Sequence, residues 1–172
     1  MGSWVGPAVV AALIAALVSA AGWFVTTRQA LALERARRRE RTRDFQIALR
    51  AEIFSELANL ARPDLDAQLA RMAERIETDA THAIFVPSLP RNLIFEAIVA
   101  DLPILPEHVL GPLVFFTRQR QVMDGLVKDI RSPEFRLLPR ATQLEVYQTY
   151  LRLWAHLREL AERAVDALSD TP

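Results

Sequence analysis

Histidine is the residue type that most often marks a metal or catalytic site, and the 172-residue chain has three histidines, His82, His108 and His156. Asp79-x-x-His82 and His156-x-x-Glu159 each place two possible ligands one helical turn apart. A di-iron helical bundle needs two Glu-x-x-His motifs and two further glutamates, and the chain has no Glu-x-x-His. The chain also has no cysteine, which excludes thiolate ligands and disulfides. We therefore expect no metal site and interpret the histidines as surface or cap residues.

Two pairs of carboxylates share helical faces, Glu52 with Glu56 and Glu159 with Glu162. A general acid/base pair needs groups that face each other across a site, which spacing along one helix cannot supply. The chain contains no P-loop, Gly-x-Gly-x-x-Gly, nucleophile elbow or zincin motif, and only two of its five glycines follow residue 22. The sequence therefore predicts no catalytic residue, no cofactor and no enzymatic activity.

Arginines are concentrated in a basic segment at residues 28–50, which has eight arginines and three acidic residues. Such a cluster suits phosphate groups, which both nucleic acids and anionic lipids carry. The segment has no aromatic residue before Phe45, and it directly follows an apolar stretch, so lipid headgroups are the expected ligand and nucleic acid is not. The candidate headgroup contacts are Arg35, Arg37, Arg38, Arg39, Arg41 and Arg43.

The apolar stretch is typical of a membrane anchor. Residues 1–27 carry no charge, and the run from Trp4 to Val25, as a helix, measures about 33 Å against a hydrocarbon core of about 30 Å. Val18-Ser19-Ala20 resembles the cleavage site of a secretory signal, the competing interpretation. Against it, no basic residue precedes the apolar run, and arginines follow it at once. The sequence predicts one transmembrane helix in the inner (plasma) membrane.

The basic segment also orients the anchor. Arginines beside a span are retained in the cytoplasm, which predicts an outside amino terminus and a cytoplasmic carboxyl-terminal domain. Translocation of that domain is the alternative. Within the anchor, Ala8, Ala12, Ala16 and Ala20 form a small-residue face, which lets two membrane helices approach closely. Either this face packs against another anchor or another membrane protein, or alanine is simply abundant here.

Helical signals fill the rest of the chain. Residues 28–62 contain no glycine or proline, so the anchor is expected to continue as a helix, with an apolar stripe from Phe45 until Pro63 ends it. Asp64 can cap a helix that ends between residues 78 and 81. Prolines favour an extended connection at residues 84–90, and a short helix is expected at residues 91–100.

Two longer helices complete the prediction. Pro106 can open a helix to about residue 130, with its buried side formed by Leu110, Leu113, Val114, Phe116, Val122, Met123 and Leu126. After a polar turn at residues 132–139, Thr142-x-x-Glu145 matches a capping box and predicts a helix to about Leu168. Residues 109–117 are uncharged but too few for a second span.

The predicted fold is therefore all-α: a single N-terminal transmembrane helix that continues into a stalk helix and a four- or five-helix bundle. We divide the chain into a transmembrane anchor at residues 1–27, a basic juxtamembrane stalk at residues 28–44 and a helical-bundle domain at residues 45–172. Four short segments follow one another in the helical-bundle domain. They are Leu49-Arg50-Ala51-Glu52-Ile53, Phe85-Val86-Pro87, residues 102–107 and Phe115-Phe116. In this order the chain resembles a broad group of uncharacterised bacterial proteins with one N-terminal transmembrane anchor and a cytoplasmic helical domain. The resemblance implies an architecture and a bacterial inner membrane, and it transfers no site residues.

Two functional hypotheses follow. The first is a membrane-anchored interaction or accessory module, a scaffold that binds a second copy of itself or another membrane protein as well as the lipid bilayer. Its candidate partner contacts are Phe115, Phe116, Leu137 and Leu138, which could instead be buried in the bundle. The second is a small-ligand sensor or enzyme with a pocket inside the bundle, lined by Tyr147, Tyr150 and Trp154 near His156 or His82.

Overall fold

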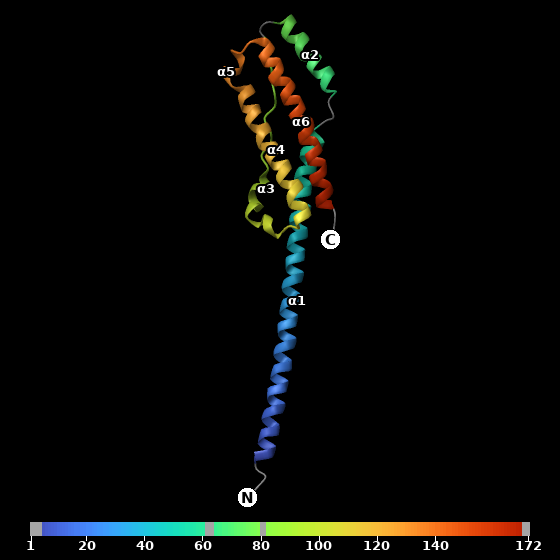
Figure 1. Cartoon of the computed structure of the whole chain (residues 1–172), viewed down its shortest axis with the longest axis vertical. Coiled ribbons are helices and arrows are strands. Elements are labelled where there is room, and N and C mark those ends of the chain that lie inside the picture. Colours follow the sequence, from blue (N-terminus) through green and yellow to red (C-terminus); the bar gives the residue numbers. More distant parts are fainter. Residues whose placement is uncertain (1–4, 61–63, 80–81, 170–172) are drawn as a thin grey trace. The chain divides into compact units, whose positions relative to one another are not determined.

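The computed structural model describes residues 5–60, 64–79 and 82–169. The chain is 87% helical and, among the residues described, no strand is present, which confirms the predicted all-α fold. Pro63 lies outside these residues, as does the start of the apolar run at Trp4. The elements in chain order (Figure 1) are α1 (Val5–Asn59), α2 (Leu65–Thr78), α3 (Leu93–Ile98), the 3-10 helix η1 (Val99–Ile104), α4 (Glu107–Arg131), α5 (Pro133–Arg136) and α6 (Arg140–Ser169).

The chain divides into two compact units, residues 1–44 and 45–172, and α1 contributes residues to both. Within the described ranges, one helix is long and apolar enough to cross a membrane, and this helix is α1. None of its apolar window is buried, whereas the core helix of a soluble protein would be mostly buried. By length, composition and exposure, α1 is thus a candidate transmembrane helix.

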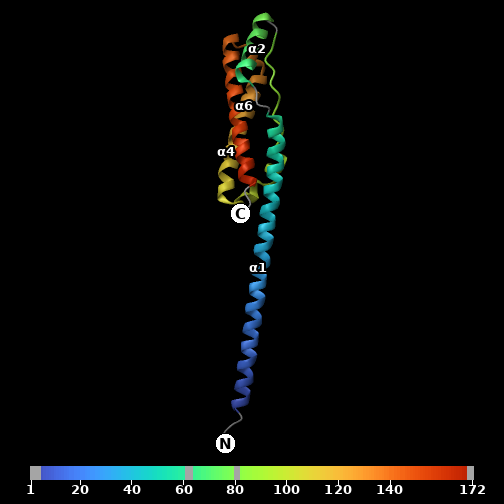
Figure 2. The same ribbon diagram turned by 90° about the vertical axis from the view of Figure 1, so that its right-hand side faces the viewer.

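The helical bundle in residues 45–172 is built around an antiparallel hairpin of α4 and α6. These two helices lie side by side in both views, and α2 packs against α6 (Figures 1 and 2). Hydrogen bonds join residues 45–60 to α3, α4 and α6. The best-buried core side chains, each no more than 3% exposed, are Leu49, Ile53, Leu60, Val86, Val109, Leu113, Phe116, Met123, Val127, Ile130, Leu151, Leu157, Ala161 and Ala164.

Helix starts follow the predicted caps in one case and depart from them in another. The Asp64 side chain accepts a hydrogen bond from the Ala67 N–H at 3.0 Å, which confirms the cap of α2. The predicted capping box at Thr142 is wrong, because α6 already begins at Arg140 and Thr142 lies within it. The Gln143 N–H donates to the Pro139 carbonyl at 3.0 Å, so backbone hydrogen bonding starts the helix earlier.

The segments before and after α4 contain two short helices that the sequence does not predict, η1 and α5. The turn at residues 132–139 contains α5, whose first turn is capped by Ser132, since its hydroxyl accepts from the Phe135 N–H at 3.2 Å. The helix expected at residues 91–100 is shorter, because α3 ends at Ile98 and passes into η1, which holds Pro103 within it. Together α3 and η1 form a compact arm beside α4.

The buried side of α4 is narrower than predicted. Leu113, Phe116 and Met123 are buried as expected, whereas Val114 and Val122 are exposed. A residue one position away on a helix points about 100° aside, so a helix covered on one side leaves such neighbours in solvent. The face of α4 with Val114 and Val122 is therefore apolar and uncovered.

Candidate functional site

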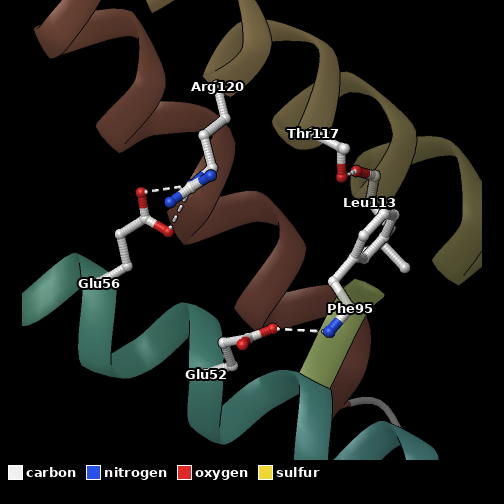
Figure 3. A network of polar contacts seen from close by, with 6 residues as sticks. All are labelled: Glu52, Glu56, Phe95, Leu113, Thr117 and Arg120. Atoms are coloured by element: carbon white, nitrogen blue, oxygen red, sulfur yellow. Dashed lines mark hydrogen bonds and ion pairs between the residues drawn. The ribbon is translucent and has the colours of Figure 1, made fainter. Parts of the chain in front are cut away.

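A carboxylate on α1 caps the short helix α3. The Glu52 oxygens accept hydrogen bonds from the backbone N–H groups of Ile94 at 2.8 Å and Phe95 at 2.9 Å. Figure 3 shows the second of these bonds. The first N–H groups of a helix lack partners within that helix, and Asn92, which precedes α3, supplies no side-chain cap. Glu52, which belongs to α1, supplies the missing cap. This contact fixes α3 beside α1.

One turn further along α1, Glu56 pairs with Arg120 of α4. The Arg120 Nε donates to both Glu56 carboxylate oxygens, at 2.9 and 3.0 Å (Figure 3). The two side chains are only 6% and 13% exposed, so this is a buried ion pair rather than a surface one. Burial raises the pKa of Glu56 above its usual 4.5, and the nearby Arg120 charge opposes that rise.

The Arg120 guanidinium is only partly satisfied. Both of its hydrogen bonds to Glu56 leave from Nε, and its Nη2 is buried without a hydrogen-bond partner among the described residues. Most buried polar atoms in proteins have a partner, and one that has none often faces a water or an ion. Among the described residues, the Arg120 Nη2 is therefore a buried cationic donor that makes no hydrogen bond.

An open pocket of about 400 Å³ lies between α3–η1 and α4, with Arg120 in its wall. Its lining combines apolar side chains with amides, a hydroxyl and two further charges. At its rim, Glu96 pairs with Arg91 and Asp124 pairs with Lys128, each at 2.7 Å. The lining residues are Asn92, Phe95, Glu96, Val99, Thr117, Arg120, Gln121 and Asp124.

This arrangement is suited to binding. Its lining offers hydrogen-bond donors and acceptors beside an apolar wall, the combination that small-molecule sites use. Glu56 is held by Arg120 and Glu52 by the α3 backbone, so both carboxylates bind groups of the protein itself. In the described parts of the chain, no group of three or more His, Asp and Glu side chains is placed to hold a metal ion.

The structure places the predicted contact residues in different environments. Phe115 is 65% exposed and Phe116 only 1%, so the second ring belongs to the core. Leu137 and Leu138 are exposed in the turn after α5, and Leu137 is 85% exposed. The carboxylates Glu159 and Glu162 lie on α6, where Glu162 pairs with Arg158 at 2.9 Å.

Residues 1–44 carry the predicted lipid and packing contacts. Ala12, Ala16 and Ala20 are exposed on α1, and the side chain of Ala8 lies outside the described part of the chain. The headgroup candidates of the basic segment are all exposed on α1 as well: Arg35, Arg37, Arg38, Arg39, Arg41 and Arg43. These positions are open to a bilayer or to another helix.

The aromatic residues that the second hypothesis assigned to a pocket lie in a row along α6 and pack against one another. The rings of Tyr147 and Tyr150 stack with centroids 5.9 Å apart, and the Trp154 ring is 5.7 Å from Tyr150. Burial raises the pKa of Tyr150 to about 12, so its phenol is protonated at neutral pH. Of the two histidines, His156 is half exposed beside Glu159 at 3.6 Å, and the His82 carbonyl accepts from Arg140 at 2.9 Å.

Sequence reasoning singled out two carboxylates beside the site and missed the residues that line it. It paired Glu52 with Glu56 on one helical face, but Arg120 is 64 residues from Glu56, and no local pattern links them. Asn92 and Gln121 looked like ordinary polar residues. One usable signal was the position of Arg120, four residues after Phe116 and three before Met123, which places an arginine near the buried side of α4.

Comparison of the chain with protein-family models, with curated proteins and with solved structures gives no match.

The pH dependence of stability should report the burial of Glu56. A raised pKa means that the folded state holds this proton more tightly than the unfolded state, so the contribution of Glu56 to stability is greatest below pH 4.5. As the pH rises through the raised pKa, that contribution is lost. We expect the wild type to lose stability relative to Glu56→Gln as the pH rises above 4.5 in denaturant titrations. A difference that stays constant with pH would contradict this.

Proposed function

We propose that this protein is a membrane-anchored interaction or accessory module, with its helical bundle on the cytoplasmic face of a bacterial inner membrane. The apolar part of α1 supports the anchor, since it is long enough to span a bilayer and none of it is buried. The arginines that follow it support the orientation, because positive charges beside a span are retained in the cytoplasm. The same arginines would bind anionic headgroups.

The observation that carries the interaction role is the outer face of α4, which we define as Gly111, Val114, Phe115, Arg118, Val122 and Gly125. Its apolar side chains are exposed, and nothing lies within 4 Å of the positions where side chains would start on the two glycines. Glycine inside a helix costs about 1 kcal/mol relative to alanine, and nothing in the described bundle explains two of them here. A partner helix could approach closely at these points.

The spacing along this face supports a helical partner. Gly111, Phe115, Arg118, Val122 and Gly125 recur at alternating intervals of four and three residues. This is the period at which one helix meets another over several turns. A second copy of the chain or another membrane protein can supply that helix, and the alanine face of α1 offers a further contact within the bilayer.

A photo-crosslinking amino acid at position 115 tests this proposal. Incorporated in place of Phe115 in the full chain in native membranes, it should form one dominant adduct with a protein. The same residue in place of Arg152, an exposed position on α6, should give little of that adduct. Equal yields from both positions, or adducts with lipid alone, would count against the interaction role of α4.

The identity of the adduct then separates the partners. An adduct of twice the mass of the chain indicates a homo-oligomer, and a foreign subunit indicates an accessory role. In either case Val122→Glu should lower the yield at position 115 several-fold, since it places a charge on an apolar contact. Ala12→Leu combined with Ala16→Leu should lower it only when the anchors also pack together.

A further inference from the structure

The pocket between α3–η1 and α4 has a charge pattern that selects among ligand classes. Its lining and the side chains paired to it comprise three bases and three acids, so the charges cancel. A ligand with a net charge would leave one of these groups uncompensated in a partly buried site, which is unfavourable. A neutral ligand, or one with two opposite charges, avoids that cost. The six groups are Arg91, Arg120, Lys128, Glu56, Glu96 and Asp124.

The inner wall of the pocket carries residues that can bind a negatively charged group. Arg120 lines the pocket and bonds Glu56 only through Nε, so it brings a positive charge to this wall. Asn92 also lines the pocket, is 8% exposed and makes no cap hydrogen bond to α3. A ligand carboxylate on this wall would pair with the Arg120 charge, since charge-assisted hydrogen bonds are the strongest that a guanidinium forms.

The rim of the pocket carries two acidic residues that can bind a positively charged group. Glu96 pairs with Arg91 and Asp124 pairs with Lys128, and the two basic side chains are 77% and 74% exposed. Exposed ion pairs of this kind contribute little, so a ligand ammonium can replace either flexible cation at small cost. Asp124 and Arg120 lie one turn apart on α4, which places the two charges along one wall of the pocket.

We propose that this pocket binds a small zwitterionic molecule of the amino-acid class. Its carboxylate lies toward Arg120 and Asn92, its ammonium group toward Asp124 or Glu96, and its side chain against Phe95 and Val99. The volume of about 400 Å³ fits a small molecule rather than a peptide segment. The site is separate from the outer face of α4, so this inference does not depend on the proposed interaction role.

The test uses the full chain in lipid nanodiscs and each proteinogenic amino acid as a separate probe. We expect one amino acid, or a few with related side chains, to raise the unfolding temperature of the protein. Equilibrium dialysis then measures the affinity for each of these amino acids. Asp124→Asn should weaken that binding at least about tenfold, as loss of a charge-assisted hydrogen bond implies. Gln121→Trp, which fills the pocket, should abolish binding.

The matched control is Asp129→Asn, which removes an acid from the same helix outside this pocket and should leave affinity unchanged. Unfolding temperatures measured without ligand establish that each variant is folded. Three results would overturn the proposal: no amino acid has an effect, binding survives Gln121→Trp, or acetate and methylamine bind as tightly as the amino acid. The first would indicate that water alone satisfies Arg120.

Discussion

Replacing Phe116 with alanine is expected to lower the free energy of unfolding by about 4 kcal/mol, because a fully buried ring is lost and a cavity remains. The neighbouring change Phe115→Ala is expected to cost less than about 0.5 kcal/mol, because that ring is exposed. The two variants remove the same side chain from adjacent residues, so each is the control of the other. Denaturant unfolding of the full chain in detergent measures both values.

The same pair separates stability from recognition. Phe115→Ala should leave the bundle folded and yet weaken the association that the outer face of α4 mediates. Phe116→Ala should lower stability first and association only as a result of unfolding. Similar losses of stability in the two variants would mean that Phe115 is covered in the working protein, and a small loss for Phe116 would contradict its place in the core.

Breaking the ion pair of Glu56 and Arg120 from either side should be costly, while replacing both residues should not. Removing one partner leaves the other charge buried and unpaired, and we expect Glu56→Leu or Arg120→Met to cost about 3 kcal/mol each. In the double variant Glu56→Leu/Arg120→Met, apolar packing replaces both charges, and stability should return to within about 1 kcal/mol of the wild type. Denaturant unfolding of the four proteins gives the coupling energy.

The double variant also shows what the pair is for. A bundle that is stable without these charges but no longer binds an amino acid would mean that Arg120 serves recognition. Strictly additive losses, with the double variant destabilised by about twice the single cost, would contradict the coupling between the two side chains.

The sequence predicted the longer helices well because their positions depend on local rules. Apolar spacing, the Asp64 cap and the prolines each act within a few residues, and they placed α2, α4 and the extended connection at residues 84–90 close to their observed bounds. The start of α6 was misplaced because a local motif at Thr142 competed with a backbone hydrogen bond to the Pro139 carbonyl, which the sequence pattern does not reveal.

The candidate site could not be predicted in the same way, because its contacts join distant parts of the chain. Glu52 meets the α3 backbone 42 and 43 residues later, and Glu56 meets Arg120 at a separation of 64. The exposure of Val114 and Val122 also depended on which side of α4 the neighbouring helices cover. Helical periodicity identifies an apolar residue but not the partner that buries it.

The hydrogen bonds of residues 52–60 bear on the order in which the protein is made and folded. Glu52, Glu56 and the Leu60 carbonyl find partners in α3, α4 and, through Arg158, α6. A chain leaves the ribosome from its amino terminus, so the first bundle segment to emerge must wait for Arg158, 98 residues after Leu60. During that interval its apolar stripe is unprotected. Folding of the bundle is thus completed only near the end of synthesis, and chaperone dependence would concentrate on nascent chains that end before α6.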